Sequence, residues 1–219
     1  KELIKSDCLP NPKGADFGGL GGAYIKNSES LLLTVGAPEH NAPEIAELAQ
    51  LDNSIFGKIL FIKNESLLNY KNQKVEYSIF SLGHRNPQGL VLINKEIFSL
   101  EHGPEGGDEL NKIIKGKNYG WPIVSFGTKY GKGKSYSRGD KNHNFEEPIF
   151  VFNPAVAPTA LNRCPDNLSK YYQNNNCLMG LSLRGMSIFI FLLDKDNTHV
   201  VSVEKIFLEK RLRHFGLDK

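Results

Sequence analysis

Residues 83–100 read GHRNPQGLVLINKEIFSL and carry the clearest fold signal in the chain. Two short apolar runs, Leu90–Ile93 and Ile97–Leu100, flank three polar residues, and this pattern predicts a β-hairpin. Similar short runs, separated by turn residues, recur at Leu31–Val35, Lys58–Ile62, Tyr77–Leu82, Ile149–Phe152, Leu178–Leu183, Ser187–Leu193 and Val200–Leu208. Many short strands without a helical period favour an all-β fold, whether a sandwich, a barrel or a propeller.

The segments between these runs complete the expected organisation. Only Pro43–Leu51 favours a helix, with its proline at the first helical position, where the missing N–H is tolerated. Gly116–Glu147 and Pro154–Asn176 are longer than hairpin loops, and loops of that length usually have a function or cover something. No tight repeat singles out the propeller. No linker is visible either, so we expect residues 1–219 to form one domain.

Composition narrows the classes of partner. The chain has 219 residues, with Lys+Arg 27 against Asp+Glu 24 and a formal net charge of +3. A charge this small and evenly spread does not favour nucleic acid as a partner. No apolar run reaches membrane-spanning length, and no signal peptide follows Lys1. We therefore expect neither nucleic acid binding nor a membrane span.

The chain contains three cysteines, Cys8, Cys164 and Cys177. None belongs to a C-x-x-C pair, so neither a zinc ribbon nor a redox motif is supported. Cys164 and Cys177 are close enough in sequence to bridge a loop in an oxidising compartment. Two free thiols are the plainer alternative, and the sequence leaves both open.

Arg85 and Asn86 stand side by side before Pro87 and Gly89, at the end of a predicted strand. A fixed guanidinium next to an amide suits a polarised oxygen or a carboxylate of a ligand. The alternative is a turn in which the two side chains only satisfy backbone carbonyls. On these residues alone, the turn is the simpler interpretation.

A glycine-rich stretch, EHGPEGGDEL, occupies residues 101–110. Its glycines allow backbone carbonyls to approach a ligand closely, and carbonyl oxygens suit Ca²⁺. The stretch does not match an EF-hand loop, which needs acidic residues at alternating positions before its glycine. A glycine-rich hairpin turn is the simpler interpretation. His102 within it could act as a base, although a structural hydrogen bond is the commoner role of histidine.

Two arginine motifs lie near the end of the chain, Ser182-Leu183-Arg184-Gly185 and Arg211-Leu212-Arg213. On a strand, alternation would put Arg211 and Arg213 on one face. Two cations on one face attract an anion such as a polycarboxylate or a phosphate. The simpler interpretation is a solvated edge strand.

Three of these motifs, taken in order, resemble the glucose/sorbosone dehydrogenase family, which includes soluble quinoprotein glucose dehydrogenases and bacterial aldose sugar dehydrogenases. They are GHRNPQGL from Gly83, EHGPEGGDELN from Glu101 and GKNYGWP from Gly116. The resemblance is strong from Leu82 to Pro122. Weaker traces flank this region at Phe17–Gly19, at Gly57–Leu60 and at the two arginine motifs.

The resemblance implies a six-bladed β-propeller, of which this chain would hold roughly four blades, with pyrroloquinoline quinone (PQQ) bound beside a Ca²⁺ ion. Arg85 and Asn86 match the pair that contacts the quinone, and Arg85 would be catalytic. Gly103 and Pro104 match residues whose backbone carbonyls hold the Ca²⁺. The cations expected to face the cofactor's carboxylates are Arg211, Arg213 and Arg184, the last of which stands where some family members have lysine.

The activity implied by the resemblance is oxidation of an aldose sugar to its lactone, with hydride transfer to the quinone and reoxidation by an external electron acceptor. The periplasm is the expected compartment. In the family the general base is a histidine well before the segment that Phe17 begins, and the chain has no histidine before Phe17. His40 lies after that segment and does not fit the role. We therefore expect residues 1–219 to be a partial propeller, without N-terminal blades and C-terminal closure, that is inactive alone.

Two other classes of function stay open. Some animal relatives of the family are binding proteins, so the first alternative is a non-catalytic propeller that binds a partner or a glycan. The second is a lactonase-type propeller hydrolase that uses Ca²⁺ and carboxylates. It would need acidic side chains aimed into the central channel, and Asp108 and Glu109 are the candidates, although both also match the dehydrogenase motif.

Overall fold

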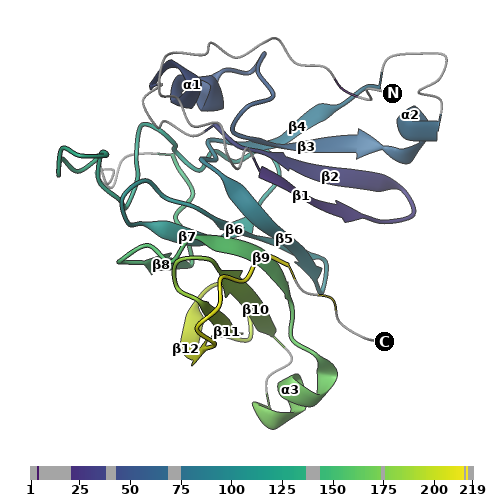
Figure 1. Ribbon diagram of the computed structural model, residues 1–219. Coiled ribbons are helices and arrows are strands. Elements are labelled where there is room, and N and C mark those ends of the chain that lie inside the picture. Colours follow the sequence, from purple (N-terminus) through teal and green to yellow (C-terminus); the bar gives the residue numbers. More distant parts are fainter. Residues whose placement is uncertain are drawn as a thin grey trace.

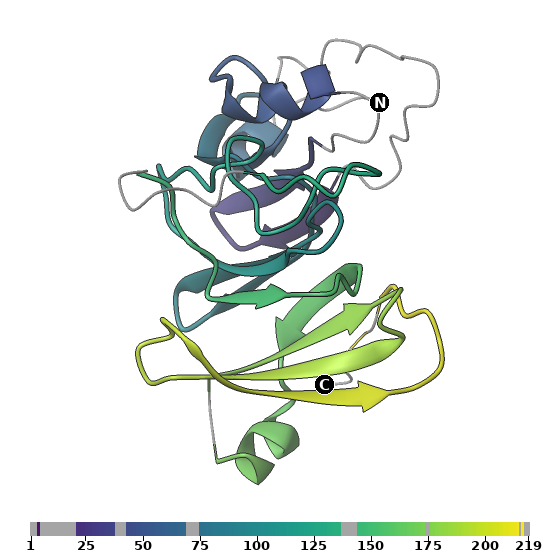
Figure 2. The same ribbon diagram turned by 90° about the vertical axis from the view of Figure 1, so that its left-hand side faces the viewer.

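The structure is a computed structural model that describes residues 4, 21–37, 43–68, 75–136, 144–173, 176–214 and 216. The described residues form three four-stranded antiparallel sheets with a few short helices between the strands. Figure 2 shows the three sheets stacked face against face along the molecule. The all-β expectation is therefore confirmed, and the described residues account for three of the roughly four expected blades.

The first sheet has the simple order β1-β2-β3-β4. Its strands are β1 (Gly21–Lys26), β2 (Ser30–Val35), β3 (Lys58–Lys63) and β4 (Ser78–Leu82). The expected helix is confirmed as α1 (Pro43–Glu47), followed by a 3₁₀ turn over Leu48–Gln50. A second helix, α2 (Asn64–Leu68), connects β3 to β4.

The other two sheets repeat this up-and-down arrangement, with orders β5-β6-β7-β8 and β12-β11-β10-β9 (Figure 1). The strands of the second sheet are β5 (Pro87–Ile93), β6 (Glu96–Glu101), β7 (Asp108–Ile113) and β8 (Phe150–Phe152). Those of the third are β9 (Pro158–Arg163), β10 (Cys177–Ser182), β11 (Ser187–Leu193) and β12 (Val200–Phe207). The hairpin expected within residues 83–100 is β5–β6, with Ile93 opposite Glu96 and Asn94 at a φ of 48°.

The sequence patterns did not predict the strands β1, β7 and β9. The segment Pro154–Asn176, expected to be a loop, contains β9 and the helix α3 (Asp166–Tyr171). In β7, residues Asp108 and Asn111 are buried and hydrogen-bonded, so its interior positions lack the apolar alternation that marks a strand. In β9 the apolar content is similarly low, because its sequence is PTALNR.

Two apolar layers hold the sheets together. Between the second and third sheets, Phe98, Leu178 and Phe191 are fully buried, and the rings of Phe152 and Phe189 meet edge to face at 4.8 Å. Between the first and second sheets the buried residues are Leu32, Ile59, Leu90, Ile113 and Tyr119. Each fully buried large side chain contributes about 1.5–3 kcal/mol. These layers fix how one sheet sits on the next.

Cys164 and Cys177 form a disulfide, with their Cα atoms 5.3 Å apart. The bridge joins the end of β9 to the start of β10 and closes the excursion that contains α3. Both cysteines are buried. The structure therefore selects pairing, the first of the two alternatives that the sequence left open; Cys8 lies outside the described residues.

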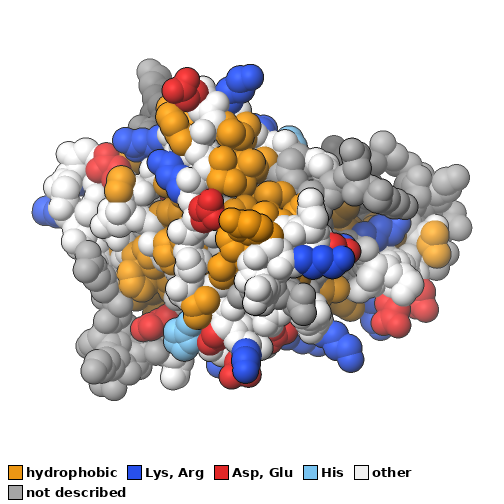
Figure 3. Space-filling view, turned by 90° about the horizontal axis from the view of Figure 1, so that it is seen from below, with side chains coloured by type: hydrophobic (Ala, Val, Ile, Leu, Met, Phe, Trp, Pro, Cys, Tyr) orange, Lys and Arg blue, Asp and Glu red, His pale blue; other side chains and the backbone are white. Residues whose placement is uncertain are grey.

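The end of the molecule that holds the third sheet is markedly apolar. Figure 3 shows a band of hydrophobic side chains across the face seen from below. On β12, Val201 is 63% exposed and Phe207 is 52% exposed. In the part of the chain that the structure describes, no helix has the length and apolar character needed to cross a membrane.

Candidate functional site

The site is built around the turn that carries the chain from β4 to β5. Gly83 begins this turn with a φ of +78°, and a Cβ on it would lie 2.1 Å from the side-chain oxygen of Asn118. Glycine is therefore required, because no other residue combines this φ with so close an approach. The residue after the turn, Pro87, starts β5 opposite Glu101. This places Arg85 and Asn86 between the first and second sheets.

Asn86 is buried, and its amide is used within the protein. Its Oδ1 accepts hydrogen bonds from the backbone N–H of Gly21 (2.9 Å) and from Nε2 of Gln88 (2.8 Å). Its carbonyl oxygen accepts from the backbone N–H of His102 at 3.1 Å. Asn86 thus connects β1 and the residues after β6 to the turn. This agrees with the simpler interpretation from the sequence, in which the side chain satisfies backbone groups of a turn.

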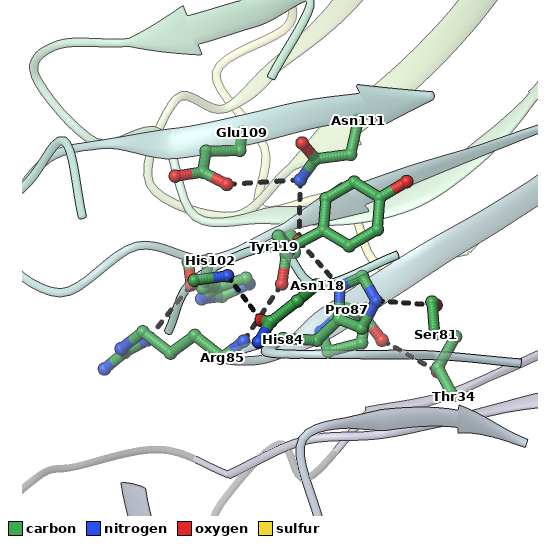
Figure 4. Close-up of polar contacts among 12 residues, drawn as sticks. Thr34, Ser81, His84, Arg85, Pro87, His102, Glu109, Asn111, Asn118 and Tyr119 are labelled. Carbon is green, nitrogen blue, oxygen red and sulfur yellow. Dashed lines mark hydrogen bonds and ion pairs between the residues drawn. The ribbon is translucent and has the colours of Figure 1, made fainter. Parts of the chain in front are cut away.

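Arg85 has a different environment, because its guanidinium is held by ring faces and oxygens. Its Cζ lies 5.3 Å from the ring centroid of Trp121 and 5.8 Å from that of Tyr130. Nη1 donates to the carbonyl of His102 (3.3 Å), and Nη2 donates to the hydroxyl of Tyr130 (3.1 Å). Stacking of this kind stabilises a cation by about 0.5–2 kcal/mol. The cation is thus fixed beside the glycine-rich loop (Figure 4).

His102 begins that loop, and its carbonyl oxygen accepts the hydrogen bond from Arg85. Its Nε2 lies 2.5 Å from the carbonyl oxygen of Pro158, which can only accept, so Nε2 carries the proton and Nδ1 presents a lone pair. Burial lowers the pKa of His102, Asp108 opposes this shift, and the charges of Arg85 and Arg213 add to it. The charges of both guanidiniums therefore disfavour the protonated form of His102.

The loop after His102 is packed around its glycines. A Cβ on Gly103 would lie 2.2 Å from the carbonyl oxygen of Gly107, so the loop closes tightly on itself. The Gly103 N–H donates to Oδ1 of Asp108 at 2.9 Å. Gly103 and Pro104 are both buried, and among the described residues we find no hydrogen-bond donor to either carbonyl oxygen.

The two acidic candidates have distinct roles. Oδ2 of Asp108 accepts from the backbone N–H groups of Val156 (2.6 Å) and Ala157 (2.8 Å), so with Gly103 its carboxylate binds three backbone donors. Glu109 lies near Glu101, and burial together with that neighbouring carboxylate raises the pKa of Glu109 to about 8. Asp108 holds backbone in place, and burial with Glu101 nearby favours the protonated form of Glu109. Neither arrangement supplies the ionised, free carboxylates of a lactonase-type site.

Arg211 and Arg213 follow the end of β12 and do not lie on a strand, which corrects the sequence-based expectation. The ladder stops at Phe207 because its partner strand begins opposite it at Ser187, and Glu209 then turns the chain with a φ of 56°. Leu212 ties the segment to the third sheet, since its N–H donates to Ser182 (3.2 Å) and its carbonyl accepts from Thr159 (2.9 Å).

The structure gathers most, but not all, of the expected site residues. Arg85, Asn86, Gly103 and Pro104 lie around His102, and the charge of the exposed Arg213 lowers the pKa of His102. Arg184 and Arg211 are exposed, and within the described residues we find no contact between them and this cluster. The Phe17–Gly19 trace and His40 lie outside the described residues.

Sequence reasoning missed two residues that shape the site. Tyr130 comes from the lysine-rich segment 129–134, and nothing in the sequence of that segment indicates a partner for Arg85. Trp121 is buried, and its ring also stacks on the guanidinium of Arg85. One signal in the sequence could have identified Trp121 as a site residue: it is the single tryptophan of the chain and lies inside the GKNYGWP motif.

Comparison with known families decides the assignment. A sequence profile described as Glucose / Sorbosone dehydrogenase matches residues 10–218, which is nearly the whole chain. The chain belongs to this family. The resemblance inferred from the three motifs is thereby confirmed.

Individual members of the glucose/sorbosone dehydrogenase family match over part of their length. Aldose sugar dehydrogenase YliI of Escherichia coli is 30% identical over 159 residues, covering 68% of the chain and 42% of that protein. Quinoprotein glucose dehydrogenase B of Acinetobacter calcoaceticus is 36% identical over 117 residues, 51% of the chain and 24% of that protein. An uncharacterized Synechocystis protein, slr1608, is 31% identical over 197 residues, 84% of the chain and 47% of that protein. The chain thus spans about half the length, or less, of these relatives.

Solved structures of the family share the fold. The soluble aldose sugar dehydrogenase of Escherichia coli in its apo form aligns with a TM-score of 0.68 at 25% identity, over 89% of the chain and 55% of that structure. The PQQ-bound aldose sugar dehydrogenase of Streptomyces coelicolor aligns with a TM-score of 0.60 at 25% identity, over 84% and 48%. The three stacked sheets of this family member are therefore blades of an incomplete β-propeller.

Proposed function

We propose that this chain is part of a sugar dehydrogenase that oxidises an aldose to its lactone, with PQQ as the redox cofactor and Ca²⁺ beside it. The observation that supports it most is the 3.3 Å hydrogen bond from Nη1 of Arg85 to the carbonyl of His102, the residue before Gly103 and Pro104. This bond joins a buried cation to a loop of inward-packed carbonyls. Family membership and the quinoprotein names of relatives support the cofactor class.

The residues at the candidate site fit both PQQ and Ca²⁺. PQQ is a planar tricarboxylate, and Arg85 and Arg213 supply cations near His102, with Arg184 and Arg211 as further proposed partners. Gly103 and Pro104 would hold the Ca²⁺ through their carbonyl oxygens, the ligand type that this ion prefers. Asp108 keeps that loop in place through the Gly103 N–H. The arginines therefore match the negative charge of PQQ, and the carbonyl oxygens match the preference of Ca²⁺ for hard oxygen ligands.

The roles of the residues follow from these positions. PQQ, when bound, would supply the two-electron acceptor that the amino acids lack. Arg85, with Asn86 next to it, would orient the cofactor and polarise its oxygens, since its guanidinium is fixed over Trp121. We propose that the base which removes the sugar's hydroxyl proton is a histidine outside these residues. Residues 1–219, as one partial propeller domain, would then be inactive alone.

The compartment and the partners are proposed with the activity. A disulfide between Cys164 and Cys177 fits an oxidising compartment, and this supports the periplasm. The small net charge of +3 offers no support for nucleic acid as a partner. An aldose sugar and an external electron acceptor are the partners that the reaction requires.

The test is dye reduction by the full-length protein over a panel of aldoses, with and without added PQQ and Ca²⁺. We expect sugar-dependent reduction that needs both additions and that falls by about 100-fold or more in Arg85→Ala, the loss typical of a removed electrostatic stabiliser. Arg163→Ala is the matched control, because Arg163 is exposed and, among the described residues, its side chain pairs only with Asp166 on the surface. A folded protein that binds neither PQQ nor Ca²⁺ would contradict the proposal and favour a non-catalytic binding module.

A further inference from the structure

Glu101 is a buried carboxylate at the end of β6, only 3% exposed. Its Oε2 accepts the backbone N–H of Arg85 at 3.1 Å. Its Oε1 accepts from Nδ2 of Asn111 at 2.7 Å and lies 3.2 Å from Nδ1 of His84. Two donors from the turn before β5 and one from β7 therefore converge on one carboxylate, which fixes its position.

His84 extends this network back to the first sheet. It is fully buried, its Nε2 lies 2.8 Å from the hydroxyl of Ser81 on β4, and its backbone N–H donates to Gly57 at 3.1 Å. Its ring stacks on Tyr119 with the centroids 4.6 Å apart. A continuous chain of hydrogen bonds thus runs from Ser81 through His84 and Glu101 to Asn111 on β7.

The order of groups in this chain matches that of a serine–histidine–carboxylate triad. Ser81 and His84 are both 0% exposed, however, so no substrate reaches the hydroxyl. The network is therefore suited to holding backbone and not to nucleophilic catalysis. The group it holds is Arg85, through the N–H that Glu101 accepts.

The backbone of Arg85 is fixed on both sides. Its N–H is bound by Glu101, and its carbonyl accepts from the N–H of Ala37 at 2.7 Å. The Cα position set by these two bonds directs the side chain over Trp121 to the hydroxyl of Tyr130. A shift of this backbone would move the guanidinium away from both rings.

We infer that Glu101, supported by His84 and Ser81, is the positioning residue that keeps the Arg85 guanidinium aimed at the cofactor. The inference rests on the proposed function for the role of Arg85, while the geometry it describes belongs to the chain itself. Glu101 would act only through Arg85. Its effect on cofactor binding is therefore coupled to that side chain and is not a general loss of stability.

A double-variant cycle on PQQ affinity measures this coupling in the full-length protein, with equilibrium dialysis of PQQ as the binding measurement. We expect Glu101→Gln to weaken PQQ binding by about tenfold or more, as loss of a charged hydrogen-bond acceptor does. In an Arg85→Ala background the same change should alter the dissociation constant by about twofold or less. An equal weakening in both backgrounds overturns the inference.

A second measurement needs no cofactor. Trp121 is the only tryptophan of residues 1–219 and is covered by Arg85, so acrylamide quenching of its fluorescence, in a full-length protein in which any tryptophan outside these residues is replaced by phenylalanine, reports whether the guanidinium is in place. We expect Glu101→Gln to raise the quenching constant as Arg85→Ala does, with no further rise in the double variant. Unchanged quenching in Glu101→Gln overturns the inference, whether or not PQQ binds. Absence of PQQ binding by the wild-type protein would instead overturn the proposed function.

Two further variants serve as a matched control and as a substitute for Glu101→Gln. Ser99→Ala is the matched control, since Ser99 is fully buried on the same strand and its hydroxyl has no hydrogen-bond partner among the described residues. It should leave both PQQ affinity and quenching unchanged. If Glu101→Gln does not fold, Asn111→Ala removes one donor from the same carboxylate and should raise the quenching constant to a smaller extent. Wild-type quenching in Asn111→Ala would then count against the inference.

Discussion

The guanidinium carbon of Arg85 lies 5.3 Å from the centre of the Trp121 ring, and the two residues are also joined through Ala37. Trp121 Nε1–H donates to the Ala37 carbonyl at 2.7 Å, and the Ala37 N–H donates to the Arg85 carbonyl at 2.7 Å. These contacts connect three parts of the chain: the residues after β2, the turn before β5 and the long segment after β7. One tryptophan therefore supports both the charge and the backbone of the arginine.

Replacing Trp121 with Phe separates these two contributions. The ring under Arg85 stays, but the Nε1–H donor is lost, which leaves the buried carbonyl of Ala37 without it. We expect the free energy of unfolding to fall by about 1–3 kcal/mol, measured by urea denaturation followed by circular dichroism. Tyr24→Phe, at a residue 65% exposed, should have no effect. Wild-type stability in Trp121→Phe would show that the hydrogen bond contributes nothing.

Lys58 is a second buried cation, and it serves the fold. It is 0% exposed, and its Nζ donates to the carbonyls of Leu48, Ala49 and Phe56, each at 2.9 Å. Lys58→Met should lower the free energy of unfolding by about 2–4 kcal/mol, since three buried carbonyls lose their donor. Lys63→Met, at the exposed end of the same strand, is the control. An equal effect of both variants would contradict this role.

The titration of Lys58 gives an independent prediction. Burial lowers its pKa from 10.5 to about 8, although Asp52 opposes the shift. Between these two pH values the unfolded chain binds the proton and the folded chain does not, so this group makes the protein more stable as pH rises from about 8 to 10.5. The stability difference between wild type and Lys58→Met should grow over this interval in chemical denaturation. A difference that is constant with pH would exclude the shift.

Glu109 should have the opposite dependence on pH. Its pKa is raised from 4.5 to about 8, so between these values the folded chain holds a proton that the unfolded chain has lost. Its contribution to stability is therefore full below pH 4.5 and declines as pH rises to about 8. Glu109→Gln, which mimics the protonated form, should flatten this decline in urea unfolding at a series of pH values. Glu105→Gln, on an exposed neighbour, should keep the wild-type profile.

The disulfide offers a test of the third sheet. Cys164 and Cys177 close a loop with a sequence separation of 13, which stabilises the fold by about 3 kcal/mol in the chain-entropy account. The double variant Cys164→Ser/Cys177→Ser should lose that amount in chemical denaturation. A reductant should have the same effect on the wild type and none on the variant. If the reductant weakens both proteins equally, another bond is responsible.

Most of the strands could be predicted because their residues satisfy local rules. In β11 and in the β5–β6 hairpin, apolar residues pack into the layers between sheets, and turn residues mark the ends. β7 escaped prediction because its buried Asp108 is stabilised by the backbone N–H groups of Val156 and Ala157, far along the chain, and its buried Asn111 by Glu101 on the neighbouring strand. No local pattern contains those partners.

For the site, the sequence by itself determined the turn that carries Arg85 and Asn86 and the tight loop that carries Gly103 and Pro104, because glycines encode both locally, while the binding roles of these residues stay predictions from the family resemblance. Their proximity also follows from local pairing, since Pro87 and Glu101 face each other in one hairpin. Only the tertiary structure decided that Tyr130 and Trp121 hold the Arg85 cation and that Glu101 holds its backbone. These contacts depend on the return of a long loop and on the stacking of separate sheets. The free energy that fixes these contacts comes from burying apolar surface between all the sheets, and no short stretch of sequence contains the residues that do so.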